Sequence, residues 1–310
     1  MKPSQSGAGP RLSAETMHAS AVASGGRAVL ISGPSGAGKS DLALRLLDRG
    51  FTLADGLFET MRARGGTVFR LDAHLDRLFA SARVLGIPIA PGLRDHVAAA
   101  SRTAFTYGYE HASVRLTVTR GPAPPGLMPP PHPAPTLALA IAPLTPSSEP
   151  RSIVAAMATA RRNEYALTSG IKTLSYTESV LALSRARAAG ADDALFLDTA
   201  GHVSEATASN VFAVIEGTLV TPPLSCGVLP GITRAAVLEI APTLGLATEE
   251  REIAEPELAM ASELFLTSSI REIAPLVRIA TTAVGTGRPG AVTQRIVAAY
   301  ATLARNECGA

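Results

Sequence analysis

The chain has 310 residues, of which 46% are hydrophobic, and this is enough for two ordinary domains with buried cores. Its 28 basic and 26 acidic residues give a net charge of +2, which argues against a nucleic-acid face or an acidic tail. The six histidines are scattered and the two cysteines, Cys226 and Cys308, lie far apart, so we predict no metal site and a reducing, cytoplasmic setting. Neither a signal peptide nor a membrane span of roughly 18 apolar residues is evident, so no membrane partner is expected.

The first half of the chain predicts strands and helices after a polar start. Residues 1–17 are expected to be disordered. RAVLISG predicts a short strand, and the apolar spacing of KSDLALRLLDRG predicts a helix that ends at Gly50. TVFRLDAHLDRLFASARVLGIP predicts a strand and an amphipathic helix, and SVRLTVTRG alternates as a half-buried strand does. The segment Thr136–Leu144 predicts a buried strand, and the proline-rich Pro122–Pro135 before it predicts a loop or, alternatively, a motif for proline-reading domains.

A domain boundary is expected at the linker-like residues 147–150. Beyond it, strands and helices alternate, and no repeat of 20–50 residues is evident. The predicted elements are the strand 152–160, the helix 178–190, the strand 193–198, the strand 209–222, the helix 232–245 and the strand–turn–strand 263–279. The sequence therefore predicts a mixed α/β (α+β) chain.

The segment GPSGAGKS, Gly33 to Ser40, matches the phosphate-loop pattern G-x-x-x-x-G-K-[ST] between a predicted strand and a predicted helix. The backbone amides of Gly36, Gly38 and Lys39 could cradle phosphate oxygens at the helix N-terminus. Lys39 would reach the outer phosphates and Ser40 would hold magnesium.

The surrounding residues 18–50 resemble the C-terminal kinase domain of HPr kinase/phosphorylase, which implies ATP and magnesium as ligands. A phosphoryl-transfer site also needs carboxylates for the metal or the base, and the following FTLADGLFET offers only Asp55 and Glu59. One strand–loop–helix unit of this size cannot bury a sheet. We interpret it as a truncated and vestigial unit, with residual nucleotide binding as the alternative.

Five sequence blocks follow in one order: DRGFTLADGLFETMR, FRLDAHLDRL, IKTLSYTESVLALSRARAAGADDALFLDTAGHVSEATASNVFAV, TPPLSCGVLPGITR and LFLTSSIREIAPL. Together they resemble the class IV (fold-type IV) aminotransferases over about residues 48–305. The family includes branched-chain and D-amino-acid aminotransferases and 4-amino-4-deoxychorismate lyase. The resemblance implies a two-domain fold with a small domain over 51–146 and a large cofactor-binding domain over 151–305. It also implies pyridoxal 5′-phosphate as cofactor, an amino acid and a 2-oxo acid as substrates, and a homodimer.

Lys172 is the only lysine beyond the phosphate loop. Its neighbours in SGIKTLSY are small and apolar, and burial would lower the pKa of its amine and make it a better nucleophile toward a carbonyl. A surface lysine is the alternative. The resemblance implies that Lys172 binds the cofactor covalently and moves a proton between substrate and cofactor.

The resemblance assigns four further residues around the cofactor ring and phosphate. Glu205 would face the pyridine nitrogen, where a carboxylate favours the protonated form; a solvated turn acid is the alternative. The backbone amides of Ile232 and Thr233, with the Thr233 hydroxyl, suit a phosphate at a helix N-terminus, and Leu229 would pack on the ring.

Arg77 matches the family's phosphate-binding arginine, since its fork suits a dianion, with a solvated helix arginine as the alternative. Ser268 and Ser269 would add hydroxyl groups to the phosphate site. Tyr176 would share a face with Lys172 if their segment is helical, and it would bind the ring hydroxyl or belong to the core.

The cofactor residues do not choose between reactions. We predict transamination of an amino acid, branched-chain-like or other, with 4-amino-4-deoxychorismate lyase as the alternative and a vestigial HPr-type kinase as the alternative of another class. An arginine that often holds the substrate carboxylate shortly after RG is replaced here by Pro125. A further possibility is that the kinase-like segment displaces the first strands of the small domain, or that RAVLISG substitutes for one of them.

Overall fold

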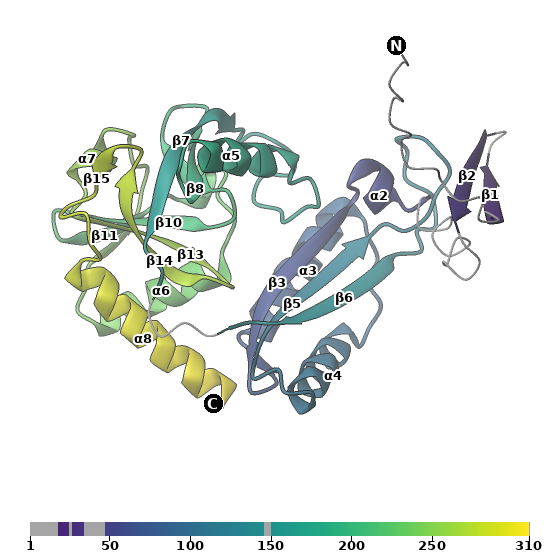
Figure 1. Ribbon diagram of the computed structural model, residues 1–310, viewed down its shortest axis with the longest axis horizontal. Coiled ribbons are helices and arrows are strands. Elements are labelled where there is room, and N and C mark those ends of the chain that lie inside the picture. Colours follow the sequence, from purple (N-terminus) through teal and green to yellow (C-terminus); the bar gives the residue numbers. More distant parts are fainter. Residues whose placement is uncertain (1–17, 25–26, 34–46, 146–149, 310) are drawn as a thin grey trace, which may run out of the picture.

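The computed structural model describes residues 18–24, 27–33, 47–145 and 150–309 (Figure 1). Within these ranges, strands β1 (His18–Ser24) and β2 (Arg27–Gly33) pair with each other in an antiparallel sheet of their own. RAVLISG is thus a strand, as predicted, but it does not substitute for a strand of the next sheet. Gly33 is its last residue. The remaining phosphate-loop residues, Gly36, Gly38, Lys39 and Ser40, lie outside the described residues, as do residues 1–17.

A four-stranded antiparallel sheet, called here the small sheet, follows with three helices. Its order is β4 (Thr67–Val68), β3 (Gly56–Arg64), β5 (His111–Thr119) and β6 (Thr136–Pro143). The helices are α2 (Arg49–Leu53), α3 (Leu71–Leu85) and α4 (Leu93–Thr106). The strand and amphipathic helix predicted from TVFRLDAHLDRLFASARVLGIP and the strand predicted from SVRLTVTRG are therefore confirmed.

The two faces of the small sheet have different neighbours because side chains alternate along a strand. Odd-numbered β3 residues such as Leu57 and Met61 are fully buried in one core with Leu75 and Leu78 of α3. Even-numbered β3 residues lie on the opposite face, and β5 continues that face through direct cross-strand pairs. These pairs are Phe58 with Thr117, Thr60 with Arg115, Arg62 with Ser113, and Arg64 with His111.

Two predictions for this part of the chain are wrong. Helix α2 begins at Arg49, with Asp48 as its N-cap, so the segment DRG starts a helix where the sequence predicted the end of one. An aspartate is a favoured N-cap, and here its Oδ1 accepts a hydrogen bond from the Gly50 amide at 2.7 Å. The segment predicted as a buried strand, Thr136–Leu144, contains the strand β6 (Thr136–Pro143), which lies at the edge of the sheet and is mostly exposed. Apolar composition alone does not distinguish an edge from a centre.

The large sheet is mixed and has nine strands. Its order is β12 (Thr248–Glu250), β11 (Thr218–Thr221), β10 (Asn210–Ile215), β13 (Glu263–Ser268), β14 (Glu272–Ile279), β7 (Ile153–Arg162), β8 (Asp193–Asp198) and β9 (Val203–Ala206), with β15 (Thr282–Ala283) on β14. The helices are α5 (Thr177–Ala188), the 3-10 helix η1 (Leu224–Cys226), α6 (Ile232–Thr243), α7 (Glu257–Met260) and α8 (Ala291–Cys308). The predicted strand 209–222 is a hairpin, because Glu216 and Gly217 both have positive φ and turn the chain between β10 and β11.

Helices α6 and α8 pack on one face of the large sheet (Figure 1). Their core includes the stacked rings of Phe212 and Phe265, whose centroids lie 5.0 Å apart. The small sheet is joined to this core at Phe69, whose ring meets that of Tyr300 on α8 edge-on at 5.5 Å. The even-numbered face of β3 also contacts the large-sheet part of the chain, because the Arg62 Nη1 donates a hydrogen bond to the Ile270 carbonyl at 2.8 Å.

No helix in the described ranges is both long and apolar enough to cross a membrane. The same part of the chain holds no group of three or more His, Cys, Asp and Glu side chains arranged for a metal ion.

Candidate active site

A cavity of about 500 Å³ lies between the small sheet and the large sheet. It brings together residues from strands β3, β5, β9 and β13, from helix α6 and from the segment before α5. All nine residues that the sequence suggested around a cofactor line it: Arg77, Lys172, Tyr176, Glu205, Leu229, Ile232, Thr233, Ser268 and Ser269. It is also lined by Phe58, Thr60, Arg115, Leu174, Ala208, Ser209, Asn210, Gly231, Thr267, Ile270 and Arg271.

Lys172 is held beside β3 by its own backbone. Its carbonyl accepts a hydrogen bond from the Phe58 amide at 3.1 Å, and Thr173 forms an isolated bridge with Leu57. The Nζ atom lies 4.4 Å from the centre of the Phe58 ring. Burial, and secondly the charge of Arg77, lowers the pKa of Lys172 to about 8. About one amine in ten is then neutral at pH 7, against about one in 3,000 for an ordinary lysine, so this amine is a competent nucleophile.

Tyr176 contacts Lys172 although the segment between them is not helical. The chain is irregular there, and α5 starts only at Thr177 with Tyr176 as its N-cap. The Lys172 Nζ and the Tyr176 Oη are nevertheless 3.1 Å apart. Burial raises the pKa of Tyr176 to about 12, so its hydroxyl stays protonated at neutral pH and can donate a hydrogen bond.

Arg77 is oriented by a buried carboxylate that sequence reasoning missed. Its Nε and Nη2 donate to Glu59 at 2.8 and 2.6 Å, and its Nη1 donates to the carbonyl of Pro230 at 2.7 Å. Burial alone would raise the pKa of Glu59, but hydrogen bonds from His74 and Arg77 lower it to about 2. The sequence pattern that could have identified Glu59 is an acidic residue in the strand followed by His74 and Arg77, which are three residues apart on one face of α3.

The N-terminus of α6 lies at the same end of the cavity as Arg77, because Pro230 directly precedes its N-cap Gly231. Unpaired amides at a helix N-terminus attract anions. A Cβ at Gly231 would lie 1.9 Å from Asn210 Oδ1, so only glycine allows this approach. Asn210 pairs in register with Thr267, which is followed by Ser268 at the end of β13 and by the turn 269–271 that leads to β14. The Arg77 guanidinium, the helix N-terminus and the serine hydroxyls could therefore bind an anion at this end of the cavity, which is called here the anion-binding end.

Glu205 lies on β9 with its carboxyl inside the cavity. It accepts a hydrogen bond from the Leu229 amide at 3.0 Å, and the Arg162 Nε lies 3.6 Å from its other oxygen. Burial raises the pKa of Glu205, and the charge of Arg162 opposes that rise. A cationic group placed against this carboxyl would favour its charged form.

Arg115 and Thr60 also line the cavity and were missed from the sequence. They face each other across β5 and β3, and the Arg115 guanidinium lies 3.9 Å from the centre of the Phe58 ring. Pro125, at the position where a carboxylate-binding arginine was sought, is exposed and does not line the cavity. The sequence pattern that could have identified Arg115 is the alternation within β5, where Arg115 lies on the face opposite to the buried Val114 and Leu116.

The donor set fits pyridoxal 5′-phosphate. The amine of Lys172, the anion-binding end and the partly buried carboxylate of Glu205 match the aldehyde, the phosphate and the ring nitrogen of that cofactor. Arg77, Ile232, Thr233 and the serines would hold the phosphate, while Lys172 and Glu205 would meet the reactive parts of the ring.

Comparison with known proteins identifies relatives of the chain. The sequence model of the amino-transferase class IV family matches residues 56–279. A putative branched-chain-amino-acid aminotransferase of Methanocaldococcus jannaschii is 34% identical over 259 residues, covering 83% of this chain and 90% of the relative. The structure of the Escherichia coli branched-chain amino acid aminotransferase superimposes with a TM-score of 0.79 at 28% identity, covering 86% and 91% of the two chains. A 4-amino-4-deoxychorismate lyase from Pseudomonas aeruginosa superimposes with a TM-score of 0.74 at 31% identity, covering 84% and 94%.

Proposed function

The chain belongs to the class IV aminotransferase family. From that premise we propose which residues of its cavity bind the pyridoxal 5′-phosphate cofactor, which bind the substrate and which move protons. The protein is a pyridoxal-phosphate-dependent aminotransferase with the fold-type IV architecture, and it transfers an amino group between an amino acid and a 2-oxo acid. When bound, the cofactor withdraws electrons from the substrate α-carbon. The division of roles among the residues, the substrate and the assembly are the proposal.

The observation that carries the proposal is that Lys172, Arg77, the N-terminus of α6 and the partly buried Glu205 line one cavity. The amine binds the cofactor and carries a proton to and from the substrate, which suits a group with a pKa of about 8. Arg77 and Thr233 hold the phosphate, and Glu205 holds the ring nitrogen in its protonated form. Tyr176 donates its hydroxyl proton toward the ring oxygen and keeps Lys172 in place.

Arg115 is proposed to bind the substrate carboxylate, taking the place of the arginine that Pro125 replaces. A guanidinium fork is well suited to a carboxylate, and the Thr60 hydroxyl lies 3.5 Å from its Nη1. The nearby Phe58, Leu174 and Ile270 offer apolar surface to the rest of the substrate. This combination favours an amino acid with an apolar, branched-chain-like side chain.

Binding of the cofactor is tested by adding pyridoxal phosphate to the purified protein and recording its visible absorbance. We expect a band that remains after dialysis and disappears in Lys172→Ala. Lys39→Ala is a matched control, because the chain has only three lysines, Lys2, Lys39 and Lys172. A folded wild-type protein that stays colourless, or a band that survives in Lys172→Ala, would contradict the proposal.

The reaction is tested with a panel of amino acids and 2-oxoglutarate, beside 4-amino-4-deoxychorismate. Transfer from leucine, isoleucine or valine supports the proposal, and release of pyruvate and 4-aminobenzoate from 4-amino-4-deoxychorismate supports the lyase alternative. Activity with D-amino acids alone would contradict the branched-chain assignment.

A homodimer in the cytoplasm completes the proposal. The side chains of Leu127 and Met128 are 83% and 84% exposed at a loop tip. The Arg49 guanidinium donates hydrogen bonds to three carbonyls of this loop, including that of Leu127 at 2.9 Å, so the apolar tip is held in place. Such a fixed apolar surface suits a second copy of the chain. Sedimentation velocity tests this, and Leu127→Ser with Met128→Ser should release monomers.

The unpaired cysteines Cys226 and Cys308 are both buried, which suits a reducing compartment. For the phosphate-loop motif Gly33–Ser40 we propose no kinase activity. Phosphoryl transfer from ATP is measured for the wild type and for Lys39→Ala, and transfer by the wild type that is lost in the variant would contradict this; a loss of ATP binding alone would indicate residual nucleotide binding.

A further inference from the structure

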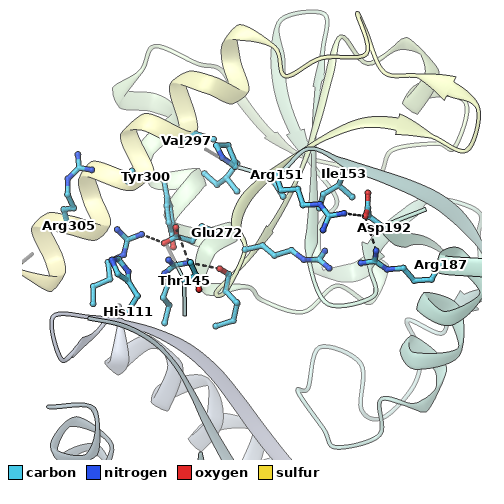
Figure 2. Close-up of a pocket in the computed structure, with 18 residues that line it drawn as sticks. His111, Thr145, Arg151, Ile153, Arg187, Asp192, Glu272, Val297, Tyr300 and Arg305 are labelled. Atoms are coloured by element: carbon cyan, nitrogen blue, oxygen red, sulfur yellow. Dashed lines mark hydrogen bonds and ion pairs between the residues drawn. The ribbon is translucent and has the colours of Figure 1, made fainter. Parts of the chain in front are cut away.

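A second cavity, of about 530 Å³, is shown in Figure 2. It meets the same even-numbered face of β3 as the first cavity. The first cavity meets this face at Phe58 and Thr60, and the second meets it further along β3, at Arg62 and Arg64. Helix α8, strand β14 and the start of strand β7 form its other walls. Six arginines line it: Arg62, Arg64, Arg151, Arg187, Arg271 and Arg305.

The described carboxylates around this cavity do not balance its arginines. Glu272 forms ion pairs with both Arg62 and Arg64. Figure 2 shows Arg151 and Arg187 both directed at Asp192, at 2.8 and 3.1 Å. Arg271 pairs with the buried Asp193. Among the described residues Arg305 has no carboxylate partner. Six guanidinium groups therefore face three carboxylates, which leaves an excess of three positive charges.

Part of this charge is buried and incompletely paired. Arg64 is 9% exposed, and Arg64 and His111 face each other across β3 and β5. The Nε atoms of Arg62 and Arg64 and the Nδ1 atom of His111 are buried without a hydrogen-bond partner among the described residues. Burial and the charges of Arg62 and Arg64 lower the pKa of His111. Holding like charges together out of water is costly, so an anion here would stabilise the fold.

We propose that this cavity binds a small organic polyanion that carries carboxylate or phosphate groups at both ends. In Figure 2, Arg305 and His111 lie at one end of the cavity, and Arg187 with Asp192 lies at the other. Guanidinium forks suit both kinds of oxyanion. The same cavity is also lined by the apolar Ile153, Ile273, Ala274, Val297 and Ala301, which suits a ligand with a carbon skeleton joining its charged groups.

The two cavities share one wall, and the test must separate them. Ile270 and Arg271 line both, and the Arg62 Nη1 donates to the Ile270 carbonyl at 2.8 Å. Arg187 and Arg305 line only the second cavity, and Arg115 lines only the first. Substitutions at these three positions assign a bound anion to one cavity or the other.

The experiment titrates the cofactor-loaded protein with citrate and, separately, with fructose 1,6-bisphosphate in a calorimeter. Loading fills the phosphate end of the first cavity. We expect one of the two probes to bind, and which one binds identifies carboxylates or phosphates as the ligand groups. Arg187→Gln and Arg305→Gln should each weaken binding by about tenfold, as expected for loss of a charged hydrogen bond. Both side chains reach the surface, and Arg187 is 51% exposed, so these variants should fold.

Arg278→Gln is the matched control, because this exposed arginine of β14 lines neither cavity. Its affinity for the probe should stay within about twofold of the wild type, and so should that of Arg115→Gln. The proposal is overturned if neither probe binds at millimolar concentration. It is also overturned if Arg187→Gln and Arg305→Gln bind as the wild type does, or if Arg115→Gln alone loses binding.

Discussion

Replacing Glu59 by glutamine tests whether this buried carboxylate positions Arg77 at the phosphate end of the active-site cavity. Glutamine keeps the shape of the side chain but removes the charge that two nitrogens of Arg77 contact at 2.8 and 2.6 Å. The pKa of Glu59 falls from 4.5 to about 2 in the folded protein. At about 1.4 kcal/mol per pKa unit, the fold stabilises the charged carboxylate by about 3 kcal/mol. Removing one partner of a buried ion pair generally costs about 3–5 kcal/mol, which agrees.

The expected loss depends on pH in a defined direction. Because the pKa of the carboxyl is depressed by folding, its stabilisation is fully present above about pH 4.5 and is lost as the pH falls toward 2. At pH 7 the unfolding midpoint of Glu59→Gln should lie roughly 6–12 °C below that of the wild type. The difference should shrink steadily between pH 5 and pH 3. The variant should also hold pyridoxal phosphate about tenfold more weakly, because Arg77 is no longer oriented.

Thermal unfolding followed by circular dichroism at a series of pH values measures this difference. Glu249→Gln is the control, since that carboxylate is 57% exposed and lies 3.4 Å from Arg251 at the surface. Its replacement should change the free energy of unfolding by less than about 1 kcal/mol. A Glu59→Gln midpoint equal to that of the control at pH 7, or a difference that stays constant down to pH 3, would refute the reasoning.

The remaining predictions concern the cofactor and the substrate. With a Lys172 pKa of about 8, the rate of cofactor uptake should rise about tenfold per pH unit below pH 8 and level off above it; stopped-flow absorbance checks this, and a rate still climbing at pH 10 contradicts it. Glu205→Gln should lower kcat by about 10- to 100-fold while the bound cofactor remains visible by absorbance, and an unchanged kcat would remove its role. Arg115→Gln should raise KM for the amino acid at least about tenfold with little change in kcat, as measured by steady-state kinetics. A lowered kcat with an unchanged KM would instead indicate that Arg115 acts in the chemical step. Gly231→Ala places a Cβ 1.9 Å from Asn210 Oδ1, so equilibrium dialysis should show weaker cofactor binding at an unchanged maximal rate, and wild-type affinity would contradict this geometry.

Local sequence patterns predicted most of the individual helices and strands. The helix α3 and the strand β5 follow from periodicity, because each buries one face against a single core. The hairpin β10–β11 was missed because it depends on left-handed backbone at Glu216, a residue that rarely adopts it. The exposure of β6 depends on its being last in its sheet, and strand order is a long-range property.

The residues of the candidate site also fall into those that local sequence patterns predict and those that depend on tertiary packing. Lys172, Glu205 and the residues of α6 lie in recognisable blocks, and the structure brings them into one cavity, although their roles are still predictions. Glu59 and Arg115 could not be assigned from the blocks. Each is a charged residue in a strand whose side chains alternate between two faces. Its role depends on whether the face that carries it packs on α3 or lies toward the large sheet. That is decided by tertiary packing.

The junction DRG, where two sequence patterns overlap, can now be assigned to one fold. The Asp48 carboxylate caps α2 and accepts a hydrogen bond from the Thr119 hydroxyl at 2.8 Å. Arg49 is 5% exposed and binds Asp55 at 2.7 Å as well as the carbonyls of loop 126–128. A Cβ at Gly50 would lie 2.2 Å from a methyl carbon of Thr119, so glycine is required there. All three residues thus make specific contacts with the small sheet and its proline-rich loop. The residues Asp48, Arg49 and Gly50 therefore belong to the packing of the small sheet, which agrees with the aminotransferase-like pattern that starts at DRG.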